Sequence, residues 1–337
     1  MTCPSSSSVE AVSRRPPEGR SGPLVAGYAC PMNAKKMHPD EVSLDVALVG
    51  RLVASQFPRW ADLPIVRVPS SGTDHAMYRL GEDMATRLPR TAKATHQLDK
   101  EHRWLPHIAV HLPLDIPIPL AKGSPGEGYP WHWSVYRWIE GEDATQERIA
   151  DPREAATQLG RFVAALQQID PREGPPPGEH NFWRGDDLRE RDLGVREALT
   201  ALHGTLDIDA AAAAWDAALQ IPVWSRPPVW VHGDLYAGNL LARRGRLTAV
   251  IDFGGLGVGD PACDVMAAWT FLSADTRDAF RTALPVDDAT WARGRGWALS
   301  AALIGLPYYE SSNPDWTTIA RRTIDGVLVD HALSQSC

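Results

Sequence analysis

The sequence predicts an α+β protein with two lobes, a small β-rich N-terminal lobe and a larger, mostly helical C-terminal lobe. Two observations support this prediction. Residues 65–88 hold three short apolar runs separated by Gly-containing turns, a pattern typical of antiparallel strands. Beyond the middle of the chain, apolar residues recur mainly with helical spacing. The expected organisation is a disordered tail over residues 1–40, an N-terminal lobe over residues 41–138 and a C-terminal lobe over residues 139–335.

The composition is that of an ordinary globular protein, and it excludes several classes. Hydrophobic residues make up 44% of the 337 residues and charged residues 23%. No run of about 18 apolar residues is present, so no membrane span is expected. The net charge of −8 argues against nucleic-acid binding, which needs a basic surface. The four cysteines are scattered and form no disulfide or metal pattern, and we expect a cytoplasmic monomer or dimer.

The N-terminal lobe is expected to contain one helix followed by strands. The tail over residues 1–40 is rich in Ser, Pro and Gly, which favours disorder. A helix is predicted over residues 44–53, with Ser43 as its N-cap. The loop between the first two strands contains Ser71 and Gly72, and small loop residues of this kind bring backbone N–H groups close to phosphates. The strands are predicted at residues 65–68, 77–80 and 84–88.

Charged residues of opposite sign follow in the third strand and in the next helix. Arg87 lies near the end of the strand. Glu101 lies in a helix predicted over residues 96–104, which Pro106 is expected to end. A cation on a strand and a carboxylate on the following helix can form a pair that holds phosphates in a kinase.

The C-terminal lobe is predicted to begin at a hinge and to consist mainly of helices. A strand over residues 131–139 is followed by Gly141, where the hinge is expected. Residues 174–192 are polar, charged and rich in proline, which predicts a loop or an insertion. Helices are predicted at residues 155–169, 209–219, 261–272, 274–284, 290–304 and 316–333.

Residues 229–264 concentrate the chemistry of the sequence. Two apolar runs are each followed by a turn with a carboxylate, Asp234 in the first and Asp252 in the second. Between these turns the pattern predicts a β-hairpin closed by residues 243–245. The hairpin brings Asp234, Asn239 and Asp252 to one end of a small sheet. Carboxylate and amide oxygens suit Mg²⁺, so the stretch predicts a phosphoryl-transfer site.

Three motifs in this stretch resemble those of the aminoglycoside phosphotransferase family, which has a protein-kinase-like fold. They are HGDLYAGN at residues 232–239, IDFG at residues 251–254 and GDPACD at residues 259–264. The first contains every fixed position of the HGDxxxxN catalytic loop of that family, where protein kinases have HRDxxxxN. The resemblance implies a small-molecule kinase that uses ATP or GTP with Mg²⁺ to phosphorylate a hydroxyl group.

The resemblance also implies a role for each residue at a motif position. Asp234 is the expected catalytic base, and Asn239 and Asp252 are the expected ligands of Mg²⁺. Arg87 stands where the family has a phosphate-binding lysine, and Glu101 stands at its helix partner. Arginine keeps the positive charge but replaces a compact ammonium group by a planar fork. A catalytically inactive pseudokinase that only binds ligands is therefore an alternative.

Two further groups of residues follow from the same resemblance. Backbone groups of Arg137 and Ile139, at the hinge, are expected to hydrogen-bond adenine. His232, Asp260 and Asp264 are expected to support the catalytic loop rather than to react.

The acceptor is predicted from charge. Residues 142–337 contain 18 Lys and Arg against 28 Asp and Glu, a balance of −10. This favours a cationic acceptor such as an aminoglycoside or a related antibiotic, and hence a resistance enzyme. Asp187, Glu190 and Glu310 are the candidate contacts for its amines. A metabolite kinase that acts on choline, homoserine or a sugar is the alternative.

Other ligand-binding patterns are not supported. Residues 255–259 lack the GxGxxG spacing of dinucleotide-binding proteins, and no GxxxxGK[ST] loop is present. His107 and His111 have a spacing that suits zinc on a helix, but prolines bracket them and a short strand is expected there.

Overall fold

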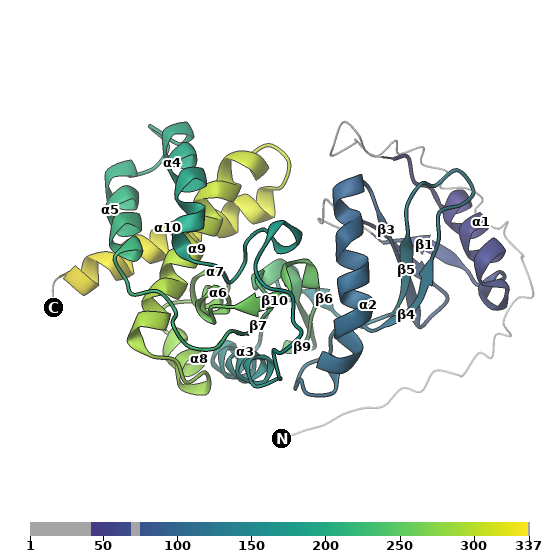
Figure 1. Cartoon of the computed structure of the whole chain (residues 1–337), viewed down its shortest axis with the longest axis horizontal. Coiled ribbons are helices and arrows are strands. Elements are labelled where there is room, and N and C mark those ends of the chain that lie inside the picture. The colour runs from purple at the N-terminus through teal and green to yellow at the C-terminus, as the bar shows by residue number, and fades with distance from the viewer. Residues whose placement is uncertain (1–41, 69–74, 336–337) are drawn as a thin grey trace, which may run out of the picture. The chain divides into compact units, whose positions relative to one another are not determined.

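The N-terminal lobe is built on a five-stranded antiparallel sheet with strand order β1-β2-β3-β5-β4 (Figure 1). The structure is a computed structural model that describes residues 42–68 and 75–335. The expected tail, Ser71 and Gly72 therefore lie outside the described residues. The predicted strands are confirmed, but β4 is not predicted because its sequence begins with proline and ends with glycine. The strands are β1 (Ile65–Arg67), β2 (His75–Leu80), β3 (Met84–Pro89), β4 (Pro119–Gly123) and β5 (Trp133–Arg137).

Two helices flank this sheet, α1 (Val46–Gln56) and α2 (His96–Ala109) (Figure 1). The buried face of α1 packs into a hydrophobic core that it shares with β2, β3 and β5. The N-cap of α1 is Asp45, whose Oδ1 accepts the Leu48 N–H at 2.7 Å. The expectation of Ser43 as N-cap is wrong. A carboxylate two residues further on satisfies the first free N–H groups and also complements the helix dipole.

Helix α2 continues past Pro106, so the expected end of this helix is wrong. A proline inside a helix removes one backbone hydrogen bond. The next turn is nevertheless held by burial, because Leu105 and Ile108 are packed in the hydrophobic core of the C-terminal lobe. His107 accordingly lies in the helix, and the short strand expected around it does not form. The same helix thus packs on the N-terminal sheet through β4 and enters the second core.

The C-terminal lobe contains two small sheets, one of which includes the predicted hairpin. Strand β7 (Val229–Val231) pairs with β10 (Gly257–Gly259), and β8 (Leu240–Arg243) pairs with β9 (Arg246–Val250). A short strand, β6 (Glu142–Asp143), joins β8 on its other edge. The hairpin turn places Arg244 and Gly245 at φ values of 53° and 76°. Two successive positive φ angles are those of a type I′ turn, which matches the twist of a β-hairpin.

Helices make up the rest of the C-terminal lobe. All of the predicted helical segments are confirmed, although residues 261–272 form two short helices, and α4 lies where no helix is predicted. Large buried side chains such as Trp215, Trp230, Trp269 and Trp297 fill its core. The helices are α3 (Pro152–Gln167), α4 (Asp192–Ala201), α5 (Ile208–Leu219), α6 (Ala262–Val265), α7 (Ala267–Thr270), α8 (Arg277–Ala283), α9 (Asp288–Tyr309) and α10 (Pro314–Gln335).

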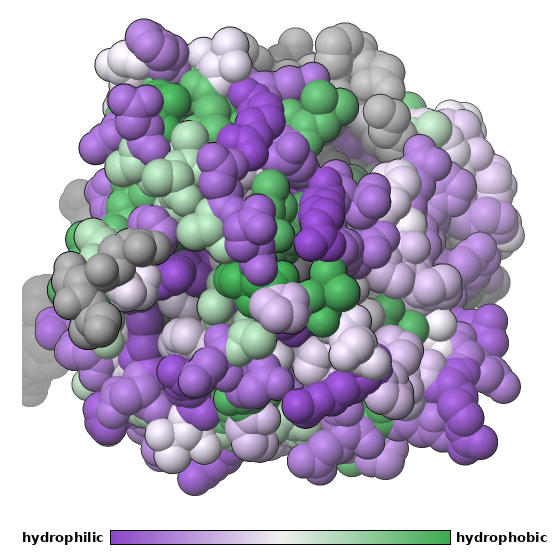
Figure 2. Space-filling view, turned by 60° about the vertical axis from the view of Figure 1, so that its left-hand side comes forward, coloured by the Kyte–Doolittle hydropathy of each residue, from purple (hydrophilic) through white to green (hydrophobic). Residues whose placement is uncertain are grey.

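The surface is mainly polar. Figure 2 shows hydrophilic residues over most of one face, with hydrophobic residues in scattered groups between them. Among residues 42–68 and 75–335, none of the helices combines the length and the apolar character needed to cross a bilayer.

Candidate active site

The loop between β7 and β8 holds the expected base in a fixed position. The Asn239 amide group donates two hydrogen bonds to Asp234, one to its carbonyl at 2.9 Å and one to its carboxylate Oδ2 at 3.1 Å. Both hydrogen bonds come from Nδ2, so the amide oxygen of Asn239 stays available for a cation. The Asp234 side chain is 38% exposed, so a second molecule can reach its carboxylate.

His232 is a neutral side chain that links this loop to the backbone of Ile251. Its Nδ1 accepts the Asp234 N–H at 3.2 Å, and its Nε2 therefore carries the proton and donates to the Ile251 carbonyl at 3.0 Å. Burial lowers the pKa of His232 to about 4. A fully buried, neutral imidazole between two backbone groups has a supporting position and does not face the open side of the loop.

The two further aspartates of the motif hold the backbone around the loop. Asp264 is fully buried and accepts the N–H groups of His232 and Gly233, each at 2.7 Å. Burial raises the pKa of Asp264 to about 6, although these two hydrogen bonds oppose the increase. Asp260 forms a buried bidentate ion pair with Arg293 at 2.6 and 3.0 Å, and it also accepts the Ala262 N–H at 2.9 Å.

Asp252 lies next to Asn239 and completes a set of oxygen donors. The Ile251 N–H donates to the Asn239 carbonyl at 2.9 Å, which brings the start of the second motif against the end of the first. Asp252 itself has a φ of 59° and a side chain that is 44% exposed. A left-handed aspartate is a strained position of the kind that gathers at functional sites. An amide oxygen and a carboxylate fit Mg²⁺, which takes few protein ligands and keeps positions for phosphate oxygens.

Arg87, the expected cation of the third strand, contacts both Glu101 on α2 and Asp252. Arg87 Nη1 lies 2.6 Å from Glu101 Oε1, and Nη2 lies 3.1 Å from Asp252 Oδ1. The Tyr136 hydroxyl donates to the other carboxylate oxygen of Glu101. Burial would lower the pKa of Arg87, but Glu101 and Asp252 together raise it. The planar fork of the arginine thus contacts two carboxylates at once through two different nitrogens.

Lys100 is a functional candidate that the sequence did not reveal. It is buried on α2 next to Glu101, and its Nζ donates to the Gly254 carbonyl at 2.7 Å. The same Nζ lies 3.3 Å from the carbonyl and from the Nδ1 of His180. Burial lowers the pKa of Lys100 to about 8, while Glu101 and Asp252 oppose this. The sequence marks Glu101 on α2 through the resemblance to the family, but Lys100 beside it belongs to no motif.

The hinge residues follow β5. The Arg137 N–H donates to the Ile118 carbonyl at 2.9 Å, and the Trp138 N–H donates to the Asp83 carbonyl at 2.8 Å. The N–H of Arg137 is therefore engaged within the lobe, and an adenine contact through Arg137 would need its carbonyl group. The contact expected from Ile139 stays a prediction.

Two arginines that the sequence did not reveal lie beside the base. Arg184 Nη2 is 3.5 Å from Asp234 Oδ1, and the Arg184 side chain is only 14% exposed. Arg191 interacts electrostatically with Arg184 and with Asp234, and burial and Arg184 lower its pKa to about 9. Burial raises the pKa of Asp234, while Arg184 and Arg191 oppose the increase. Both arginines come from the segment predicted as a loop or insertion, where no motif marks them.

Two of the three carboxylates predicted to contact a cationic acceptor form ion pairs with arginines of this chain. Asp187 caps a short 3-10 turn and pairs with Arg189 at 2.8 Å. Glu310 pairs with Arg321 at 2.9 Å, and Glu190 is exposed. Two of the three carboxylates are therefore already neutralised by arginines. The sequence identified the acidic balance of the lobe, but it could not show which acidic side chains are paired.

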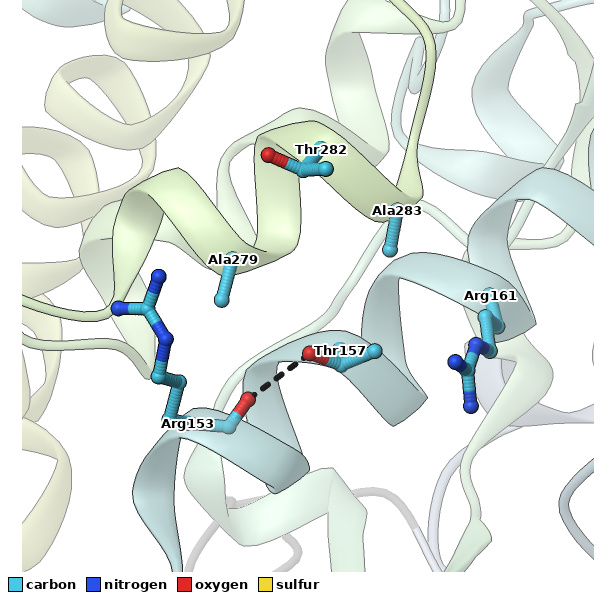
Figure 3. A pocket seen from close by; sticks show the side chains of 6 residues that line it. All are labelled: Arg153, Thr157, Arg161, Ala279, Thr282 and Ala283. Carbon is cyan, nitrogen blue, oxygen red and sulfur yellow. Dashed lines mark hydrogen bonds between the residues drawn. The ribbon is translucent and has the colours of Figure 1, made fainter.

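A separate surface pocket lies between α3 and α8 (Figure 3). Its volume is about 380 Å³ and its lining residues are Arg153, Thr157, Arg161, Ala279, Thr282 and Ala283. None of the residues expected to act in phosphoryl transfer lines it. Arg153 is engaged at one end, where its carbonyl accepts the Thr157 hydroxyl and its guanidinium pairs with Asp278.

Several solved structures are similar to this chain. Aminoglycoside 2'-phosphotransferase-IIIa, in its GDP complex, is similar in structure with a TM-score of 0.67 at 18% identity, over 86% of this chain and 100% of that one. Macrolide 2'-phosphotransferase MphH from Brachybacterium faecium gives a TM-score of 0.56 at 21% identity, over 82% of this chain and 97% of that one. The streptomycin and ATP complex of APH(2")-IIa gives 0.54 at 18% identity, over 81% and 93%. These similarities show the kinase-like fold.

The sequence comparison identifies the family directly. No curated protein matches the chain at a significant level. Residues 65–297, which include β1, the catalytic loop and both further motifs, match the phosphotransferase enzyme family. This match covers more than half of the chain, and the chain therefore belongs to the phosphotransferase enzyme family.

Proposed function

We propose that the protein transfers the γ-phosphoryl group of ATP or GTP to a hydroxyl group of a small molecule. One observation carries this proposal: Asn239 holds the Asp234 carboxylate through its amide nitrogen, and its backbone carbonyl accepts the N–H of Ile251, the residue directly before Asp252. A base that a second molecule can reach is thus adjacent to a pair of cation ligands. This is the arrangement that phosphoryl transfer needs, because positioning and charge neutralisation supply most of the catalysis.

In the proposed reaction, the acceptor hydroxyl lies against the Asp234 carboxylate. Its oxygen forms a bond to the γ-phosphorus as the bond from that phosphorus to the bridging oxygen breaks, and the nucleoside diphosphate leaves. The hydroxyl proton passes to Asp234 Oδ. Burial favours this transfer because it raises the pKa of Asp234.

Asn239 and Asp252 are the residues that would hold Mg²⁺, which when bound neutralises the charge on the β- and γ-phosphates. Arg87 would hold the phosphates from the other side, as a guanidinium already oriented by Glu101. Ser71, Gly72, Arg137 and Ile139 are proposed to contact the nucleotide. His232, Asp260 and Asp264 are proposed to keep the catalytic loop in place.

The test is release of nucleoside diphosphate in the presence of Mg²⁺ with ATP or GTP, measured with and without acceptors. The first panel contains kanamycin, a macrolide, choline, homoserine and sugars. Kanamycin and macrolides are included because the structural neighbours are aminoglycoside and macrolide phosphotransferases. We expect acceptor-dependent release that is lost in Asp234→Ala. Release that persists unchanged in this variant would refute the assignment.

A catalytically inactive binding protein is the second candidate, and one observation favours it. Arg87 contacts Asp252 directly, so the arginine competes with a cation for this carboxylate. A thermal-shift experiment separates the two functions. Mg·ATP or Mg·GTP at 100 times its Kd adds about 2.7 kcal/mol of stability. A nucleotide-dependent shift without any phosphoryl transfer, to an acceptor or to water, would favour the binding protein.

A further inference from the structure

The segment that precedes α4 forms a loop that is built against the catalytic loop. Residues 178–187, here called the 178–187 loop, are held by Asn181, which is fully buried. Asn181 accepts the Gly178 N–H at 3.0 Å and donates to the Arg184 carbonyl at 3.0 Å. The Gly185 carbonyl accepts the Asp260 N–H at 2.7 Å. The loop therefore has a defined conformation that is tied to the motif following the metal site.

Two successive aromatic residues in this loop have strained backbones. Phe182 and Trp183 have φ values of 56° and 54°, and their side chains are 57% and 43% exposed. Bulky residues rarely adopt a left-handed conformation, and such strain persists only where the surrounding structure imposes it. Neither aromatic side chain is buried, so burial does not offset the cost of the strain. The residue that follows them, Arg184, has a side chain that is only 14% exposed.

Arg184 reaches the base from this loop. Its stem packs on the catalytic loop so closely that a Cβ added to Gly233 would lie 2.9 Å from Arg184 Cβ. At its far end, Nη2 lies 3.5 Å from the carboxylate of Asp234. Among the described residues, Nη1 of Arg184 has no hydrogen-bond partner although it is buried. A buried donor without a partner is costly, and this one has hydrogen-bonding capacity to offer a ligand.

Arg191 adds a second positive charge next to the first. Its Nε donates to the Ser300 hydroxyl at 2.8 Å, and its guanidinium lies over the Trp297 ring at 5.2 Å. Neither contact neutralises its charge. Of the two aspartates in the last motif, Asp260 is already paired with Arg293, and Asp264 accepts two backbone N–H groups. Asp252 also acts on Asp234, but it is itself paired with Arg87 at 3.1 Å. Asp234 is thus the carboxylate that Arg184 and Arg191 face, and two positive charges beside it are the opposite of a site for a polycation.

We propose that the acceptor carries a negatively charged group, a carboxylate or a phosphate, close to the hydroxyl that is phosphorylated, and that Arg184 and Arg191 bind this group. This proposal rests on the proposed phosphoryl-transfer function and names the class of its acceptor. Guanidinium groups pair with both anions through charge-assisted hydrogen bonds. The net negative charge of the C-terminal lobe does not contradict the proposal. The charges close to Asp234, and not the sum over the lobe, determine which acceptor group binds there.

A binding experiment tests the proposal without knowledge of the natural acceptor. The full-length protein is first saturated with Mg²⁺ and a non-hydrolysable ATP analogue, and inorganic phosphate or kanamycin is then titrated while the unfolding temperature is recorded. We expect phosphate, and not kanamycin, to stabilise the protein. Arg184→Met and Arg191→Met should each raise the phosphate concentration at half-effect by about 10- to 100-fold, the range of a charge-assisted hydrogen bond. Arg189→Met is the matched control, because Arg189 lies in the same segment but is exposed and paired with Asp187.

The outcomes separate this proposal from the function on which it rests. Failure of the ATP analogue to stabilise the protein would contradict the proposed function. Stabilisation by the analogue but not by phosphate, or stabilisation by kanamycin, would overturn the anionic acceptor. Equal effects of Arg189→Met and Arg184→Met would overturn it as well.

A kinetic experiment distinguishes the two anions and an alternative role for Arg184. Nucleoside diphosphate release is measured with glucose, gluconate and glucose 6-phosphate as matched acceptors. We expect a charged member to exceed glucose, and Arg184→Met to raise KM for it with a smaller effect on kcat. A fall in kcat alone, equal for all acceptors and for water, would instead place Arg184 on the transferring phosphoryl group and refute acceptor recognition.

Discussion

The ion pair between Arg87 and Glu101 should be among the most costly contacts to break in the N-terminal lobe. The two side chains are 11% and 1% exposed, and their nearest charged atoms lie 2.6 Å apart. Removing one partner of a buried pair leaves the other charge uncompensated, which costs about 3–5 kcal/mol. The second contact of Arg87 adds little, because the Asp252 side chain is 44% exposed and exposed pairs contribute about 0–1 kcal/mol. We therefore expect Arg87→Met to lower the free energy of unfolding by about 3–5 kcal/mol.

Urea unfolding of four proteins measures this effect and its cause. They are the wild type, Arg87→Met, Glu101→Gln and the double variant. In the double variant no buried charge is left unpaired, and the neutral amide can still accept from the Tyr136 hydroxyl. Most of the lost stability should therefore return, as a coupling energy of at least about 2 kcal/mol. Arg321→Met is the control, because its pair with Glu310 is exposed and should contribute about 1 kcal/mol or less. Equal losses in Arg87→Met and Arg321→Met would refute the reasoning.

Three further predictions follow from the site. Asp234→Ala should lower turnover by about 10²–10⁴-fold, since it removes a positioned base, while nucleotide affinity is retained. Loss of nucleotide binding in this variant would contradict the prediction. Burial lowers the pKa of His232 to about 4, so the unfolded chain takes up this proton first as the pH falls. Relative to His232→Asn, the wild type should lose up to about 3 kcal/mol of stability between pH 6.5 and 4 in urea unfolding, and parallel pH profiles would contradict it. A Cβ on Gly259 would lie 2.2 Å from the Gly185 carbonyl oxygen, so Gly259→Ala should cost about 1–3 kcal/mol and disturb the 178–187 loop. Gly50→Ala, whose Cβ would meet only open space and one methyl group, should cost nothing in the same assay.

The sequence predicts the positions of Asp234, Asn239 and Asp252 relative to one another because local spacing determines them. Asp234 and Asn239 are five residues apart in one loop, and a two-residue hairpin turn sets the distance to Asp252. Their arrangement therefore depends on few long-range contacts. The pair of Arg87 and Glu101 is also predictable, since the strand and the helix that carry them are adjacent in the chain.

The residues that surround the base are not predictable in this way. Arg184 contacts Asp234 across 50 positions of sequence, and two residues with strained backbones directly precede it. No sequence pattern predicts a left-handed backbone conformation at Phe182 or Trp183. The net charge of a lobe is likewise a poor guide to a site, because ion pairs such as those of Asp187 and Glu310 remove acidic side chains from the local balance.

Helix α2 connects Arg87, the motif that contains Asp252, and the 178–187 loop. Two consecutive residues of α2 make the connection: Glu101 pairs with Arg87, while Lys100 donates to the Gly254 carbonyl of the metal motif and to the His180 carbonyl. His180 belongs to the 178–187 loop, which positions Arg184 against the base. A movement of α2 would therefore act on Arg87, on the motif that contains Asp252 and on the 178–187 loop together. Because the fork of Arg87 bridges α2 and the metal motif directly, the arginine strengthens this connection, which a lysine, as a single point charge, would leave to Lys100 alone.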